Sequence, residues 1–110
     1  MNNKRRKKID RIYDALMSVD TQENLSADFK KIQKEIDSIL YDEQDAFDNL
    51  PEGLQYSYNG QRSEEAIASL EEASDIIGEY QFLRDEEKKD TSVVDDIVNR
   101  AADCLYDAML

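Results

Sequence analysis

Apolar residues recur at helical spacing along most of the chain, and the longest such stripe lies within residues 25–50. Its positions follow one another in alternating steps of four and three residues, with Glu43 as the one polar interruption. Such a seam predicts a long helix that buries one face, and Leu40 and Phe47 widen that face as a bundle helix requires. The stripe consists of Leu25, Phe29, Ile32, Ile36, Ile39, Glu43, Ala46 and Leu50.

Three shorter stretches show the same periodicity and predict three more helices. They lie within residues 3–18, 63–84 and 91–110. Gly78 falls inside the second of these stretches, where glycine costs about 1 kcal/mol relative to alanine. We therefore expect either a bend or a close contact with another helix at this position.

Residues that cap helices separate the four stretches. Asp20 followed by Glu23 fits the spacing of a capping box before the helix at 25–50. Ser63 is the expected N-cap of the third helix, and Thr91 or Ser92 that of the fourth.

The segment between the second and third helices holds the only proline and two of the three glycines. Pro51 disfavours a helical conformation in the residue before it, so it ends the second helix. Gly53 can adopt a positive φ, and Asn59-Gly60 is a strong tight-turn dipeptide. We expect an ordered loop here.

These elements predict a single all-α domain over residues 1–110. At about 1.5 Å per residue the second and third helices span roughly 36 and 31 Å, lengths that match. Because a short connection joins them, they are expected to pair in an antiparallel hairpin. The predicted fold is a four-helix arrangement centred on that long hairpin.

Charge is unevenly distributed along the chain. The sequence has 14 Lys and Arg against 26 Asp and Glu, a net charge of −12, yet a basic run opens it. Cations are unfavourable at the positive end of a helix dipole, so residues 1–8 are expected to form a frayed tail. The acidic remainder favours a basic protein partner, although acidity also serves plain solubility. The run comprises Lys4, Arg5, Arg6, Lys7 and Lys8.

The basic run leaves two interpretations open. It could contact nucleic acid or an acidic partner, and it is the only segment through which direct nucleic-acid binding is expected. Alternatively it is a solvated tail, or one that lies on the protein's own acidic surface.

The residue types argue against catalysis. The chain has no histidine, which removes Ser-His and Cys-His pairs and the commonest general base. Cys104 falls on the apolar face of the last helix, where a buried structural thiol is expected. The carboxylates at 42, 43, 45 and 48 lack the calcium-loop pattern and fit a solvated helix face. We expect no enzyme activity, no metal and no cofactor.

Two groups of residues are candidates for partner binding. Leu54, Tyr56 and Tyr58 alternate across the predicted loop, where they either cap the open end of the bundle or contact a partner. The acidic positions of the third and fourth helices could imitate a phosphate backbone, or simply belong to an ordinary acidic bundle. The acidic candidates are Glu71, Glu72 and Asp75.

The sequence also bears on the setting of the protein. No apolar run approaches the 18 residues of a membrane span, and the basic start is not followed by the apolar core of a signal peptide. The single cysteine favours a reducing, cytoplasmic environment.

Residues 47–55, with the sequence FDNLPEGLQ, are followed by Ser63 and by AIASLEEA at residues 66–73. In this region the chain resembles a family of short acidic proteins of bacteriophages and Gram-positive bacteria. Members of that family carry an Asn-(Leu/Met)-Pro-Glu-x-Leu-Gln loop between two long helices. The resemblance covers roughly residues 32–80 and implies the helical hairpin and a phage or prophage context, but no activity.

The function expected from the sequence is protein–protein interaction by a phage or mobile-element accessory or regulatory protein. A homodimer is also expected, because two shorter helices are not expected to cover all of the wide stripes on the second and third helices. The alternative is a DNA mimic that inhibits a host nucleic-acid-binding or defence enzyme.

Overall fold

A computed structural model of the chain describes residues 2–19 and 25–110, and all regular secondary structure in these residues is helical. The predicted all-α class is therefore confirmed. The long helices are α1 (Asn3–Met17), α2 (Leu25–Asp48), α4 (Tyr58–Glu79) and α6 (Thr91–Met109). The short elements are α3 (Glu52–Gln55), the 3₁₀ turn η1 (Tyr80–Phe82) and α5 (Asp85–Lys88).

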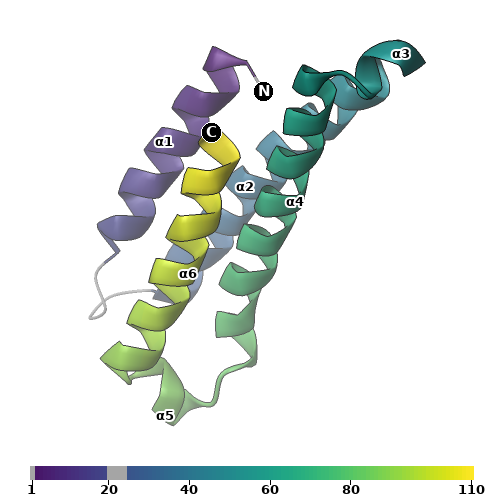
Figure 1. Cartoon of the computed structure of the whole chain (residues 1–110). Coiled ribbons are helices and arrows are strands. Elements are labelled where there is room, and N and C mark those ends of the chain that lie inside the picture. Colours follow the sequence, from purple (N-terminus) through teal and green to yellow (C-terminus); the bar gives the residue numbers. More distant parts are fainter. Residues whose placement is uncertain (1, 20–24) are drawn as a thin grey trace.

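The four long helices pack side by side in an elongated molecule of 51 × 22 × 18 Å. Helix α4 packs against both α2 and α6, and α1 packs against both α6 and α2. Neighbouring long helices run in opposite directions, so α1 and α4 begin at the end of the molecule where α2 and α6 finish (Figure 1).

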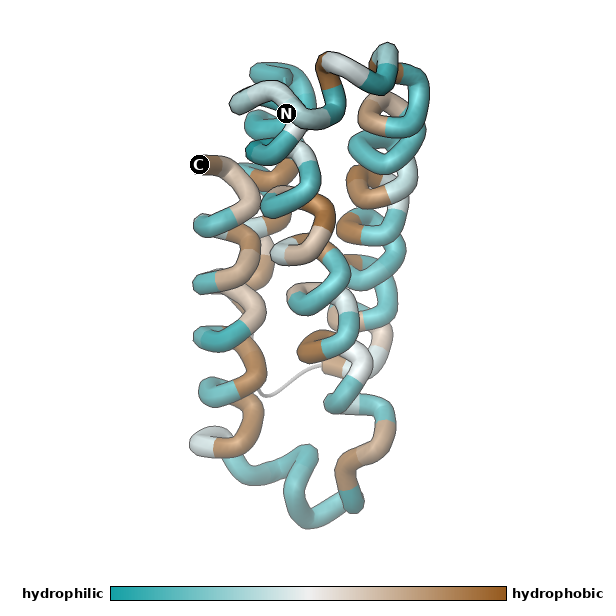
Figure 2. The backbone as a smooth tube through the Cα atoms, turned by 45° about the vertical axis from the view of Figure 1, so that its right-hand side comes forward, coloured by the Kyte–Doolittle hydropathy of each residue, from teal (hydrophilic) through white to brown (hydrophobic). Residues whose placement is uncertain are grey.

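The core runs along the axis between the long helices. Figure 2 shows the hydrophobic positions of each helix turned toward the others and the hydrophilic positions turned outward. In the α2 stripe every member from Leu25 to Glu43 is buried, whereas Ala46 and Leu50 are half-buried. One chain thus covers most of the stripe that was the reason for expecting a homodimer.

An aromatic contact closes the core at the end near α5. The rings of Phe29 and Tyr80 meet edge to face with centroids 4.7 Å apart. The ammonium group of Lys88 lies 5.3 Å from the centroid of Tyr80. Burial raises the pKa of the Tyr80 phenol.

Gly78 marks a close contact, one of the two outcomes expected for it. A Cβ at this position would lie 3.0 Å from Nε2 of Gln33 on α2. That amide donates a hydrogen bond to the carbonyl oxygen of Ser74 at 3.1 Å. The Ser74 hydroxyl in turn donates to Asp37 at 2.6 Å, so polar contacts help to align α2 with α4.

Three details of the predicted connection are wrong. Helix α4 begins at Tyr58 with Ser57 as its N-cap, so Ser63 is a buried helix residue and not the cap. Asn59-Gly60 lies in the first turn of α4 and not in a tight turn. Gly53 lies in α3, and no described glycine has a positive φ.

The predicted N-cap of the last helix is also wrong. Helix α6 begins one residue before Ser92, with Asp90 as its N-cap, so neither Thr91 nor Ser92 has that role. The predicted capping box of Asp20 and Glu23 lies outside the described residues. Helix α2 ends at Asp48, just before Pro51, as predicted.

Candidate protein-interaction surfaces

The connection between α2 and α4 exposes three large side chains, which we call the aromatic connection. Leu54 is 52% exposed, Tyr56 74% and Tyr58 75%. Side chains with these exposed fractions do not cover the end of the bundle core. The capping role that the sequence left open is therefore not what these residues do in this structure.

The backbone beneath these side chains is held by specific contacts. The side-chain amide of Gln55 donates to the carbonyl oxygens of Phe47 at 3.3 Å and Leu50 at 3.2 Å, which fixes α3 to the end of α2. A Cβ at Gly60 would lie 2.5 Å from the carbonyl oxygen of Leu54, so only glycine lets α3 pack this closely on α4. The exposed side chains thus stand on a defined support.

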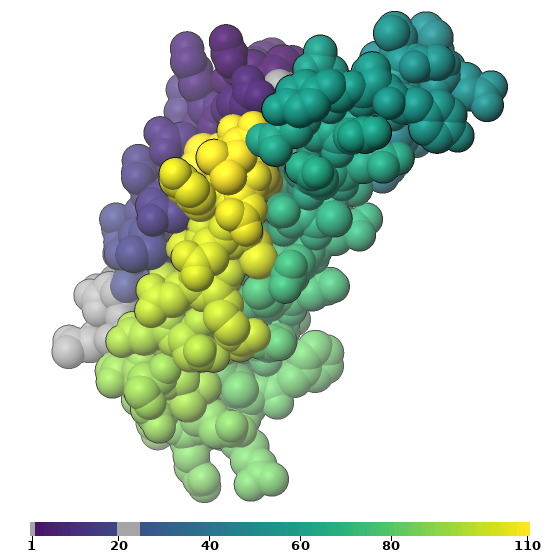
Figure 3. Space-filling view, in the orientation of Figure 1, coloured from purple at the N-terminus to yellow at the C-terminus, as the bar shows by residue number. Residues whose placement is uncertain are grey.

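A second surface is the groove between α4 and α6, which we call the acidic groove. It has a volume of about 480 Å³ and is lined by Glu72, Asp75 and Glu79 of α4 and by Asp103 and Asp107 of α6. The carboxylates of α4 are 24 or more positions away in the sequence from those of α6, and the two helices lie side by side on one face of the molecule (Figure 3). Glu71 is exposed but does not line the groove.

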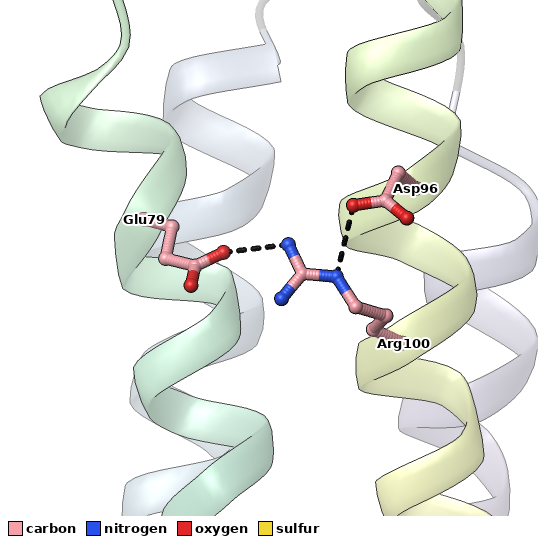
Figure 4. A network of polar contacts seen from close by, with 3 residues as sticks. All are labelled: Glu79, Asp96 and Arg100. Atoms are coloured by element: carbon pink, nitrogen blue, oxygen red, sulfur yellow. Dashed lines mark hydrogen bonds and ion pairs between the residues drawn. The ribbon is translucent and has the colours of Figure 1, made fainter.

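Arg100 closes the acidic groove at one end (Figure 4). Its Nη2 donates to Glu79 across the groove at 2.7 Å, and its Nε donates to Asp96 on its own helix at 2.9 Å. The hydrogen bond to Glu79 is the main reason why the pKa of Arg100 is raised. Because these side chains are about half exposed, the network contributes little stability, and its one guanidinium offsets one of the two carboxylate charges at this end of the groove.

Cys104 is buried beneath the acidic groove, as its place on the apolar face predicts. Burial raises the pKa of its thiol to about 11, and the neighbouring carboxylates of Glu72, Asp107 and Asp103 add to the shift. Since the thiolate is the reactive form, this thiol is poorly suited to be a nucleophile near neutral pH.

The basic run forms the first turns of α1, with Asn2 as the N-cap that accepts a hydrogen bond from the Arg5 backbone. Two of its cations contact the rest of the protein. Arg5 donates to the buried carboxylate of Glu43 at 2.7 Å, and Arg6 donates to the carbonyl oxygen of Met109 at 3.1 Å. Whether the first turn frays in solution stays a prediction.

These contacts determine which cations of the basic run remain available to bind nucleic acid. Lys4 and Lys7 are exposed and Lys8 is half-buried, whereas Arg5 is engaged by Glu43.

The described carboxylates near the end of α2 do not form a metal site. Glu43 is separated from Asp42, Asp45 and Asp48, because its side chain turns into the core. Within residues 2–19 and 25–110 no group of three or more Cys, Asp or Glu could hold a metal ion.

Comparisons with protein-family models, curated proteins and solved structures found no match for this chain. The resemblance to acidic phage proteins therefore stays a prediction. In the described part of the chain, none of the helices has the length and apolar character needed to cross a membrane.

Proposed function

We propose that this protein is a non-enzymatic protein–protein interaction module that binds its partner through the aromatic connection. The supporting observation is that Leu54, Tyr56 and Tyr58 are each more than half exposed on a backbone held by Gln55 and Gly60. Tyrosine is enriched among the residues that dominate binding energy. A support that is already ordered reduces the conformational entropy lost on binding.

The chemistry of the partner follows from the charge of the protein. A net charge of −12 and the acidic groove favour a partner with a basic surface. In this proposal the aromatic connection supplies most of the affinity, and the carboxylates around Glu72 and Asp75 accelerate association and orient the partner.

The experiment starts by finding the partner. A photoreactive phenylalanine derivative at position 56 should crosslink a protein in a lysate of the native host, and the same derivative at position 41 should not. Tyr41 is the matched control because it is 72% exposed on α2, away from the connection.

Affinity for the purified partner then tests the residues. Tyr56→Ala and Tyr58→Ala should each weaken binding about tenfold or more, as expected of central interface tyrosines, without lowering the melting temperature. Tyr41→Ala should change neither quantity. Unchanged affinity in both connection variants would overturn the proposal, and a lowered melting temperature would show a structural role instead.

The acidic groove favours a second candidate, a DNA mimic that inhibits a host nucleic-acid-binding or defence enzyme. Five carboxylates of two rigid helices line one face of the molecule, an arrangement that can compete with a phosphate backbone. Binding to such an enzyme should fall steeply with salt and be lost when duplex DNA is added. Glu72→Lys or Asp75→Lys should weaken this binding more than Glu71→Lys does. Binding that is insensitive to salt would rule mimicry out.

The biological setting belongs to the same proposal. We place the protein in the cytoplasm, as an accessory or regulatory factor of a phage or mobile element that self-associates as a homodimer. Sedimentation equilibrium checks the dimer, and the genes that flank the coding sequence check the phage context. A monomer at high micromolar concentration would remove the dimer from the proposal.

We also propose that the hairpin of α2 and α4 is the centre of a four-helix fold. The packing of α4 on α2 and the polar contacts of Gln33 and Asp37 with Ser74 support this. Native-state hydrogen exchange should then find the slowest amides in α2 and α4. Slower exchange in α1 than in either hairpin helix would contradict it.

A further inference from the structure

An arginine-lined pocket lies at the end of the molecule where α1 and α4 begin. Arg5 and Arg6 of α1 and Arg62 of α4 line a cavity of about 510 Å³, together with Phe47 and Tyr58. Small-molecule pockets commonly have volumes of about 300–1,000 Å³, so a ligand of moderate size fits here. Three guanidinium groups around one cavity are unexpected in a chain with a net charge of −12.

The charge of this pocket rests on two of the three arginines. Arg5 is held by the buried carboxylate of Glu43 at 2.7 Å and is neutralised there. Arg6 has no carboxylate partner among the described residues, since it donates to Met109 O and to the side-chain oxygen of Asn3. The described residues that line this pocket include no Asp or Glu.

Arg62 is only weakly engaged. Its Nη1 donates to Glu65 at 3.3 Å in an exposed pair three residues apart on the same helix. Exposed pairs of this kind contribute little, so a ligand can replace Glu65 at small cost. Within the described chain, Nη2 of Arg6 and Nη2 of Arg62 donate no hydrogen bond.

The start of α4 also borders this pocket. Tyr58 and Asn59 line it and are the first two residues of the helix. The Gly60 N–H of this first turn donates to the Ser57 hydroxyl oxygen at 3.3 Å. The N–H groups of Tyr58 and Asn59 have no acceptor within the helix and lie at the positive end of its dipole. Such helix starts are common binding sites for phosphate, and here the arginines supply the charge as well.

We propose that this pocket binds the phosphate group of a small molecule, with Arg6 and Arg62 donating hydrogen bonds to its oxygens. Arginine matches phosphate geometry with two parallel hydrogen bonds, and the ring of Phe47 provides an apolar wall for the organic part. The site does not depend on the aromatic connection acting as a partner surface. Because free phosphate and a phosphate monoester present the same oxygens to the arginines, the ligand is one of these two.

Isothermal titration calorimetry on the full chain tests the site with four probes: inorganic phosphate, pyrophosphate, adenosine 5′-monophosphate and adenosine. The phosphate-bearing probes should bind one to one, and adenosine should not bind. Stronger binding of the nucleotide than of inorganic phosphate assigns a monoester, and equal binding assigns free phosphate. NMR spectra should show the largest amide shifts at Tyr58, Asn59 and Arg62.

Arg62→Gln is the decisive variant, because losing this guanidinium removes only an exposed ion pair from the fold. It should weaken binding of the phosphate-bearing probes at least about tenfold, as expected for a lost charge-assisted hydrogen bond. Lys89→Gln is the matched control, because it removes the same charge at the opposite end of the molecule. The proposal would be overturned if no phosphate-bearing probe bound saturably or if adenosine bound as tightly as adenosine 5′-monophosphate. It would also be overturned if Arg62→Gln left binding unchanged.

Discussion

Arg5 and Glu43 are 38 residues apart in the sequence, and their side chains meet at 2.7 Å where α1 packs against the end of the α2 stripe. The side chain of Glu43 is 1% exposed, so it occupies a core position of the stripe with the Arg5 guanidinium beside it. A buried carboxylate is tolerated when cations and hydrogen-bond donors surround it. This pair therefore connects the first helix to the polar interruption of the second.

Removing Arg5 should destabilise the protein. Arg5→Met takes a charge-assisted hydrogen bond from a buried carboxylate and should lower the free energy of unfolding by about 1.5–3 kcal/mol. Urea denaturation measures the change. Arg5→Met combined with Glu43→Leu should lose less, because leucine at position 43 needs no polar partner. The exposed-pair variant Arg62→Gln should change stability by less than about 0.5 kcal/mol, and an equal loss in both arginine variants would contradict this interpretation.

Gly60 and Gly53 should respond differently to alanine. A Cβ at Gly60 would overlap with the carbonyl oxygens of Leu54 and Gln55, whereas a Cβ at Gly53 meets nothing within 4 Å. Gly60→Ala should therefore cost about 1–3 kcal/mol of stability, as overpacking does. Gly53→Ala should be neutral or stabilise by about 0.4–1 kcal/mol, since its φ is not positive. Thermal melting of the two variants side by side decides the matter.

The Cys104 thiol should react slowly in the native protein. Its pKa of about 11 means that little thiolate exists at pH 8, and its side chain is only 9% exposed. Ellman's reagent should therefore label Cys104 much faster in urea than in buffer. Glu72→Gln should lower the pKa and accelerate labelling, because Glu72 opposes the thiolate. Glu71→Gln is the control and should leave the rate unchanged.

The same thiol makes stability depend on alkaline pH. A pKa raised on folding contributes stability that is present below the unfolded-state value of 9.0 and is lost as pH rises through about 11. Cys104→Ser should reduce this loss between pH 9 and 11. A stability profile in that range identical to that of the unmodified chain would show that Cys104 is not responsible.

Asp90 should make the start of α6 sensitive to acid. The Ser92 hydroxyl donates to Asp90 at 2.8 Å and the Ser92 backbone at 3.0 Å, and both bonds lower the pKa of the Asp90 carboxyl. The stabilisation is present above the unfolded-state pKa and is lost as pH falls through the lowered folded-state value. Ser92→Ala should raise the pKa of Asp90, which NMR titration of its carboxyl carbon measures. An unchanged titration would show that the hydroxyl bond does not form in solution.

Much of the fold could be predicted because helix periodicity is local. The stripe from Leu25 to Ile39 requires only that one face be buried, and the structure buries each of its members. The connection was predicted less well, since Asn59-Gly60 fits a tight turn by local preference but lies in a helix. Packing decided it, because Gly60 lets the backbone of α3 approach α4. A turn dipeptide does not show that its glycine serves a tertiary contact.

The candidate surfaces divide in the same way. Tyr56 and Tyr58 were recognisable as candidates from their place between two helices, but only the structure shows that they do not cover the core. Glu72 and Asp75 were recognisable as acidic, and only the packing of α4 on α6 placed them beside Asp103 and Asp107. Arg6 and Arg62 carried no shared signal, since 56 positions separate them in the sequence.

The sequence by itself determined the all-α class, the long helices and the acidic character, because these follow from residue spacing and composition. Tertiary structure alone decided which residues became neighbours across helices. Glu43 shows the difference: its place in an apolar stripe marks it as an interruption, but its partner Arg5 comes from a basic run that sequence patterns treat as a tail. Such pairings depend on how helices pack, and packing joins residues that no local pattern connects.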